Sequence, residues 1–251
     1  TDPNMTRFMM TLEDAINLVN SNFGGVTIPG ATDSTFTPPV NIVGTVYYYC
    51  EVSQTGLNCD ITSAAAKITT TPSPSFSNQP IGLQKLCVGG TPSLLSVSYV
   101  GGNNSASYQW YQNNVNSNIG GLPIVGAISN SYLPATTVSG VTYYYCVVSF
   151  SIGGCSAITS NTAEVEVLDD PVITNHPLFS QMICEGTTIG QPLTFSYTGG
   201  SGATSIAWYQ TGSPDILING ISDTSFQPII FTTTGTYKYY AVLTDSGKGC
   251  N

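Results

Sequence analysis

The sequence is poor in charge. Only 8% of its 251 residues are charged, with five Lys and Arg residues against 14 Asp and Glu residues. Nucleic-acid binding requires clustered basic side chains, so the net charge of −9 argues against a nucleic-acid partner and against an anionic membrane surface. His176 is the single histidine, which excludes a multi-histidine metal site and a histidine base.

Long apolar runs are also missing. None approaches the roughly 20 residues of a transmembrane helix, so we expect no membrane insertion. No signal peptide opens the chain. Because the cysteines described below indicate an extracellular setting, we expect the chain to be part of a longer protein. Cys-x-x-Cys pairs and Asp-rich calcium loops are absent, and a calcium ion near Asp169 and Asp170 is only a minor alternative. We therefore predict a protein without metal, cofactor or enzymatic activity.

Other residues are abundant. Apolar residues make up 41% of the chain, with 15 tyrosines and 26 glycines. β-Branched, aromatic and turn-forming residues together are typical of an all-β protein. The seven cysteines recur at similar positions, which indicates an oxidising, extracellular setting.

An internal repeat organises the chain. "GTVYYYCEVSQTGLNC" (residues 44–59), "GVTYYYCVVSFSIGGC" (140–155) and "GTYKYYAVLTDSGKGC" (235–250) are copies of one pattern, spaced by about 97 residues. We define module 1 (19–73, partial), module 2 (74–170, complete) and module 3 (171–251, without its last strand). Residues 1–18 do not match the repeat, and we interpret them as an artefact or a coincidence rather than as a functional element. Short proline-containing joints between modules predict a semi-rigid rod.

Each module is expected to be a two-sheet β-sandwich, because several short strands alternate with turn signals. A tryptophan in a "WYQ" strand and a later "Y-x-C" strand resemble the immunoglobulin fold. The resemblance implies that Trp110 and Trp208 lie in the module cores. It also implies that the tyrosine-corner residues are Tyr48, Tyr144 and Tyr239. Val97 stands where an immunoglobulin domain has its first cysteine, so the inter-sheet disulfide is not expected.

The modules are similar to immunoglobulin-like repeats of giant bacterial surface adhesins, including the gliding-motility type exported by type IX secretion. This resemblance implies a non-enzymatic stalk or adhesion segment on the cell surface, with neighbouring repeats as partners. Residues 1–18 separately resemble a short motif of UDP-N-acetylglucosamine 4,6-dehydratases. That alternative is weak, because the chain has neither a G-x-G-x-x-G turn nor a Tyr-x-x-x-Lys pair.

A second alternative is a glycan-binding accessory module of a large secreted enzyme. Strand alternation predicts a set of outward tyrosines that could stack on sugars: Tyr111, Tyr143, Tyr145, Tyr209 and Tyr240. Cross-strand tyrosine pairs can equally stabilise an exposed sheet face. Exposed edge strands make self-association a further option.

The cysteines allow several pairings. A regular hairpin would place Cys146 opposite Cys155 and Cys50 opposite Cys59, within disulfide reach, and we predict these two bonds. In module 3 Ala241 replaces the first cysteine, which leaves Cys250 either unpaired or joined to Cys184. A rival scheme joins Cys87 to Cys155 and leaves Cys146 as a buried thiol.

Overall fold

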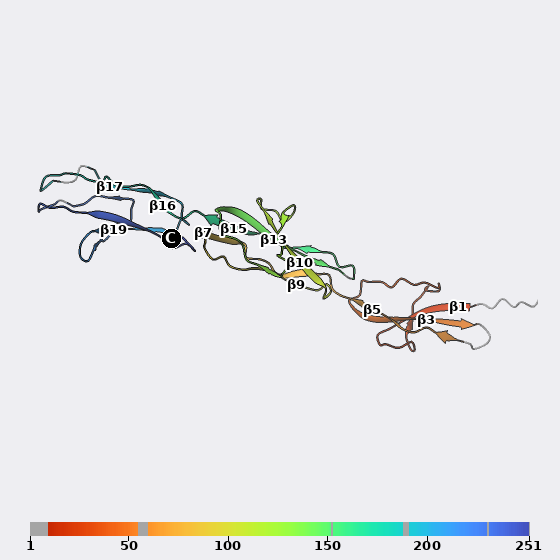
Figure 1. Ribbon diagram of the computed structural model, residues 1–251. Coiled ribbons are helices and arrows are strands. Elements are labelled where there is room, and N and C mark those ends of the chain that lie inside the picture. Colours follow the sequence, from red (N-terminus) through yellow and green to blue (C-terminus); the bar gives the residue numbers. More distant parts are fainter. Residues whose placement is uncertain (1–9, 55–59, 152, 188–190, 230, 251) are drawn as a thin grey trace, which may run out of the picture. The chain divides into compact units, whose positions relative to one another are not determined.

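The structure is a computed structural model that describes residues 10–54, 60–151, 153–187, 191–229 and 231–250. The described residues contain β-strands and no helix. The chain divides into two compact bodies, Thr1–Ser75 with Gly101–Asn104 and Phe76–Val100 with Ser105–Asn251. Figure 1 labels the strands of both.

The first body holds one sheet with the order β2-β1-β3-β4, and β5 pairs with β3. Its strands are β1 (Met10–Asn17), β2 (Val26–Thr27), β3 (Gly44–Gln54), β4 (Ile61–Thr62) and β5 (Ala66–Thr70). The described part of this N-terminal segment, Met10–Asn17, forms β1. It pairs with β3 in the register Asp14↔Cys50 and adds a strand to the sheet of module 1.

Module 2 has two layers, as alternating strands require. The larger sheet has the order β11-β10-β13-β15-β7 with β14 on β13, and two short pairs, β12-β8 and β6-β9, form the rest. The strands are β6 (Ser75–Asn78), β7 (Leu83–Cys87), β8 (Leu95–Ser96), β9 (Ser98–Val100), β10 (Ala106–Asn113), β11 (Leu122–Pro123), β12 (Ser131–Tyr132), β13 (Gly140–Phe150), β14 (Ile158–Thr159) and β15 (Ala163–Leu168).

Module 3 repeats this layout with fewer strands. A sheet with the order β20-β19-β22 is accompanied by the pairs β16-β18 and β17-β21. The strands are β16 (Val172–Asn175), β17 (Leu193–Thr194), β18 (Ser196–Thr198), β19 (Thr204–Gln210), β20 (Ile216–Ile218), β21 (Ser225–Phe226) and β22 (Tyr239–Asp245).

Each of these two modules has a core built around one tryptophan. Trp110 and Trp208 are fully buried, and their indole N–H groups donate to Ser129 O at 3.0 Å and Asp223 O at 2.9 Å. A buried indole needs such a partner. Both tryptophans sit at the same point of their sheets, because Trp110 pairs with Cys146 and Trp208 with Ala241.

The loss of the cysteine in module 3 has a packing explanation. Val97 and Cys146 are both buried in the core of module 2. The counterpart of Val97 is Phe195, whose ring lies 5.8 Å from the Trp208 ring in an edge-on contact. Phe195 is larger than Val97 and Ala241 is smaller than Cys146, so the two exchanges offset each other in part around Trp208.

Candidate functional site

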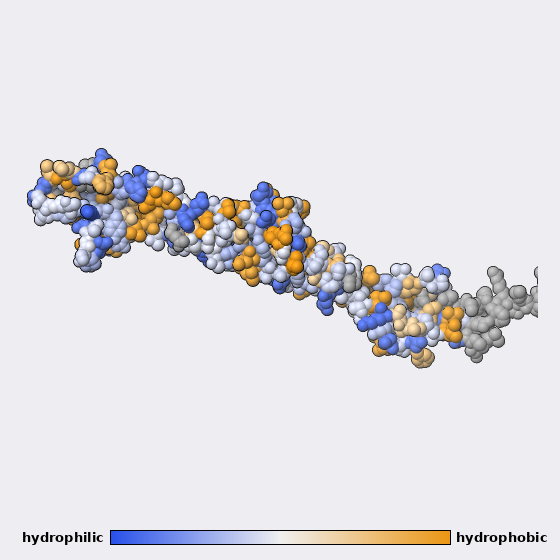
Figure 2. All heavy atoms as spheres, in the orientation of Figure 1, coloured by the Kyte–Doolittle hydropathy of each residue, from blue (hydrophilic) through white to orange (hydrophobic). Residues whose placement is uncertain are grey.

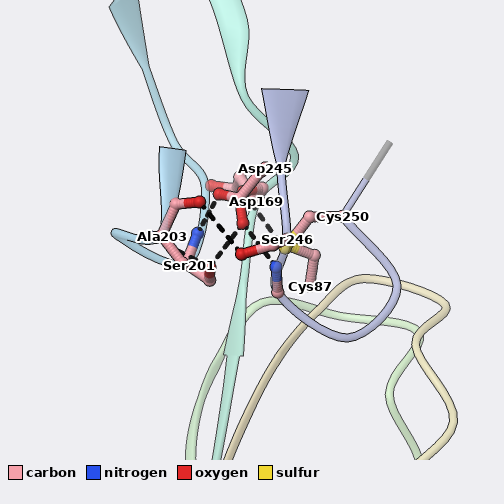
Figure 3. Close-up of a disulfide and its surroundings, with 8 residues drawn as sticks. Cys87, Asp169, Ser201, Ala203, Asp245, Ser246 and Cys250 are labelled. Carbon is pink, nitrogen blue, oxygen red and sulfur yellow. Dashed lines mark hydrogen bonds between the residues drawn. A yellow bond between two sulfur atoms is a disulfide. The ribbon is translucent and has the colours of Figure 1, made fainter. Parts of the chain in front are cut away.

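A disulfide bond joins module 2 to module 3. Cys87, at the end of β7, is bonded to Cys250, and their Cα atoms lie 4.9 Å apart although 163 residues separate them in sequence. Next to the bond, the Cys87 N–H donates to Lys248 O at 2.9 Å. The loop of module 3 that follows β22 is therefore held to module 2 by the disulfide bond, which Figure 3 shows, and by this hydrogen bond.

Backbone contacts hold Cys87 in place from the module 2 side. The Val88 N–H donates to Leu168 O at 2.8 Å and the Gly89 N–H donates to Thr136 O at 2.9 Å. The buried Thr136 hydroxyl donates to Gly90 O at 2.9 Å. Because these backbone groups are hydrogen-bonded, the turn holds the Cys87 sulfur at a defined position.

Two glycines allow the loop of module 3 to approach. A Cβ atom on Gly90 would lie 2.6 Å from Lys248 O, and one on Gly249 would lie 2.1 Å from the Gly90 Cα. Gly249 also has φ of +76°, a conformation that other residues rarely adopt. This close approach explains why glycine stands at position 249 in the sequence "KGC", which the repeat alone does not explain.

A carboxylate organises the loops beside the bond. Asp245, at the end of β22, is buried and accepts hydrogen bonds from the Ser201 N–H at 2.6 Å and the Gly247 N–H at 2.7 Å. The Ser201 hydroxyl also donates to it. These donors, with the Ser201 hydroxyl foremost, lower the pKa of Asp245 below its ordinary value, against the opposing effect of burial. Asp245 therefore stays charged and ties the loop after β18 to the loop that carries Cys250 (Figure 3).

Asp169 and Asp170 lie at this junction. Asp169 O accepts from the Gly200 N–H at 2.8 Å. Within the described ranges, no three His, Cys, Asp or Glu side chains come together as metal ligands. Asp170 Oδ1 is buried without a hydrogen-bond partner, and nothing in the structure explains it.

The predicted hairpin disulfide Cys146–Cys155 is wrong for this structure, where both thiols are unbridged. The register explains the error. β13 pairs with β14 as Val147↔Thr159 and Val148↔Ile158, so Cys146 faces Ser160 and exchanges two hydrogen bonds of 2.9 Å with it. Burial raises the pKa of the Cys146 thiol to about 12.

The other cysteine predictions have different outcomes. Cys59 lies outside the described residues, and so does the predicted bond Cys50–Cys59. Cys50 accepts from the Ser63 N–H at 2.8 Å, which repeats the Cys146–Ser160 arrangement. The alternatives Cys184–Cys250 and Cys87–Cys155 are both excluded by the Cys87–Cys250 bond, and Cys184 is exposed.

The tyrosines are not one outward-facing patch. Tyr145 was predicted to be exposed, but it is only 3% exposed. Its hydroxyl accepts from the Gly121 N–H at 3.0 Å, and its ring stacks on Tyr111 with centroids 5.1 Å apart. Tyr49 is buried in the same way and accepts from the Gly25 N–H at 2.8 Å. The loop after β10 therefore covers Tyr145, a contact that strand alternation cannot predict.

The matching pair in module 3 is more open. Tyr209 stacks on Tyr240 with centroids 5.2 Å apart, and Tyr240 is 38% exposed. The Tyr240 hydroxyl donates to Asp215 at 2.8 Å, which raises the pKa of Tyr240 and, with the Gly212 N–H, lowers that of Asp215. Of the other predicted site residues, Tyr143 is half-buried, Tyr48 and Tyr144 are buried, and Tyr239 is half-buried.

Hydrophobic side chains are spread over the visible surface among polar ones (Figure 2). Among the described residues, no helix is long and apolar enough to span a membrane.

Comparisons with a family profile and with solved structures returned matches. A family profile described as "Domain of unknown function (DUF8696)" matches residues 78–169, within module 2. A search of curated proteins found no match. An I-band fragment of titin aligns with a TM-score of 0.50 at 12% identity, covering 98% of this chain and 84% of that one. Immunoglobulin domains 1–5 of Sidekick-1 align with a TM-score of 0.38 at 16% identity, covering 92% of this chain and 49% of that one. The titin likeness shows that the chain is a tandem of immunoglobulin-like β-sandwiches.

Proposed function

We propose that the chain is a load-bearing stalk segment of a secreted bacterial cell-surface adhesin or filament, and that it has no enzymatic role. The bacterial and adhesin parts of this proposal rest on the sequence resemblance. The Cys87–Cys250 bond is the observation that favours a stalk. Disulfides persist mainly in oxidising compartments, which also favours an extracellular location.

The bond gives the stalk a mechanical path. Tension applied along the chain passes through β6 and β7, the first two strands of module 2, and then reaches Cys87. The disulfide then carries the force directly to Cys250, so residues 88–249 stay outside the loaded path. Modules 2 and 3 can therefore keep their non-covalent structure under a force that would unfold a sandwich without such a bond.

Single-molecule stretching between the two ends of the chain tests this. Without reductant we expect no extension from residues 88–249. With reductant the chain between Cys87 and Cys250, a sequence separation of 163, should add about 570 Å, at roughly 3.5 Å per residue. A Cys87→Ser/Cys250→Ser variant should give the longer extension in both buffers. Equal extension of the native chain with and without reductant would refute the mechanical role.

A further inference from the structure

Module 2 keeps its charged side chains at one edge of its larger sheet. Residues 86–163 contain no Asp, Glu, Lys, Arg or His. The charged residues of the module lie on two neighbouring strands or directly after them: Lys85 on β7, Glu164 and Glu166 on β15, and Asp169 and Asp170 after β15. These strands form one end of the order β11-β10-β13-β15-β7, so the opposite edge of the sheet carries no charge.

The uncharged edge is apolar. Residues 122–127 run beside β10 as the outermost segment of the sheet, because the Ile124 N–H donates to Trp110 O at 2.9 Å and the Trp110 N–H donates to Ala127 O at 3.0 Å. We call residues 115–133 the neutral edge. Its exposed apolar side chains are Val115, Ile119, Leu122, Val125, Ile128 and Leu133. Exposed apolar surface that is gathered in this way marks a site of interaction.

The neutral edge has both protruding side chains and a hollow. Val125, Ile128, Tyr132 and Leu133 border an open hollow of about 360 Å³, and the loop before β11 carries the exposed side chain of Ile119. In a two-fold contact the same patch serves both partners, so the protruding side chains of one copy meet the hollow of the other. A second copy therefore matches this edge in shape as well as in its lack of charge.

Module 1 repeats part of the neutral edge. Val19, Phe23 and Val26 are exposed, and they stand where module 2 has the first three apolar residues of that edge. Module 1 also has a hollow at the corresponding place, of about 210 Å³. Exposed apolar residues that recur at the same positions of a repeat are not singly scattered, which is the ordinary case for surface apolar residues.

Module 3 lacks these features. Exposed Asn219 and Ser222 take the places of Val125 and Ile128, and an exposed carboxylate, Asp223, follows directly. Polar and charged side chains along a sheet edge prevent association. The same edge of the fold is therefore apolar in module 2 and polar in module 3, which gives the chain an internal reference.

We propose that the neutral edge of module 2 is a self-association surface, which binds the neutral edge of a second copy of this chain side by side. Burial of the apolar side chains drives the contact, and no charge on either side opposes it. Pro123 in β11 has no N–H group, so side chains make the contact rather than an added ladder of backbone hydrogen bonds. The inference adds a lateral partner and is independent of the proposed stalk function.

Sedimentation velocity of the whole chain over a range of concentrations tests the proposal. Salt at about 0.15 M screens the repulsion between the acidic parts of the two copies. Val125→Glu places a charge on a side chain that is 100% exposed, so the fold is not disturbed. Val138→Glu is the matched control, since Val138 is 77% exposed and lies outside the neutral edge.

We expect the native chain and the Val138→Glu variant to form the same reversible dimer. Val125→Glu should weaken dimerisation at least about tenfold, because two like charges then enter one contact. Val125→Lys should do the same, and an equal mixture of the Val125→Glu and Val125→Lys chains should recover dimers. Amide exchange in residues 115–129 should slow as the concentration of the native chain rises, whereas residues 211–223 of module 3 should not change.

Three outcomes would overturn the proposal. The first is a native chain that stays monomeric up to about 1 mM. The second is an equal effect of Val125→Glu and Val138→Glu, which would assign association to net charge alone. The third is a monomeric chain whose amides in residues 115–129 are protected by a soluble β-glucan, which would assign the neutral edge to a sugar.

Discussion

Cys87 and Cys250 are bonded across the junction of modules 2 and 3, and the closed loop spans 163 residues. Loop entropy for this length corresponds to about 5 kcal/mol of stabilisation, as an upper value. We expect the free energy of unfolding of the Cys87→Ser/Cys250→Ser variant to be lower by up to that amount. The variant should therefore unfold at a lower urea concentration. Reduction of the native protein should produce the same shift, and if neither treatment changes the midpoint, the bond contributes nothing to folding stability.

The approach of the two loops depends on Gly90. A Cβ there would meet Lys248 O at 2.6 Å, so Gly90→Ala should reduce the yield of the Cys87–Cys250 bond at equilibrium in a glutathione redox buffer. Gly82→Ala is a matched control, since its Cβ would meet nothing within 4 Å. Peptide mapping without reductant gives both yields, and equal yields would contradict the steric argument.

Asp245 should make the stability of module 3 sensitive to acid. Its pKa is lowered in the folded chain, from an ordinary value of 3.8. Its contribution is therefore complete above pH 3.8 and is lost as the pH falls through the folded pKa. Asp245→Asn should cost on the order of 1 kcal/mol at pH 7, and the difference from the native chain should shrink below pH 3.8. Urea titrations at several pH values measure this difference, and a difference that does not change with pH would contradict the role of the Asp245 carboxylate.

The thiols should differ widely in reactivity. Cys146 is fully buried with a pKa of about 12 against an ordinary 9.0, so its thiolate fraction at pH 8 is about a thousandfold smaller than that of an unperturbed thiol. Exposed Cys184 should be alkylated first, and Cys146 only after unfolding. Peptide-resolved mass spectrometry over time measures this, and early modification of Cys146 would contradict its burial.

Trp208 is the central side chain of module 3. Trp208→Ala should lower the free energy of unfolding by about 3–5 kcal/mol, as other large aromatic truncations do. The neighbouring Leu217→Ala, at a position that is 46% exposed, should have a much smaller effect. Urea unfolding followed by far-UV circular dichroism compares them, and similar losses for both would contradict the core assignment.

Strand alternation predicts the buried face of β13 correctly, but it is wrong about Tyr145 on the opposite face. Alternation puts Tyr144, Cys146 and Val148 on one face of β13, and these residues are buried together in the core. It also placed Tyr145 outside, but the loop after β10 folds over that face and Gly121 donates to the Tyr145 hydroxyl. A period of two describes the faces of one sheet and carries no information about a loop that returns to cover one of them.

The N-terminal segment shows a similar limit. Residues 1–18 share no motif with the repeat, yet Met10–Asn17 pairs with β3 along its whole length. Backbone hydrogen bonds make a ladder with little regard to side-chain identity, so a sequence can occupy a strand position without resembling the strand it matches.

By itself, the sequence determined the all-β class, because aromatic and β-branched residues alternate between turn signals, and it determined the repeat, because three copies are spaced almost equally. Tertiary structure alone decided the cysteine pairing. The register of β13 on β14 moves Cys155 away from Cys146, and the approach of Gly249 to Gly90 brings Cys250 to Cys87. A disulfide forms where Cα atoms come within about 7 Å, and for residues 163 positions apart that distance is set by how the modules pack.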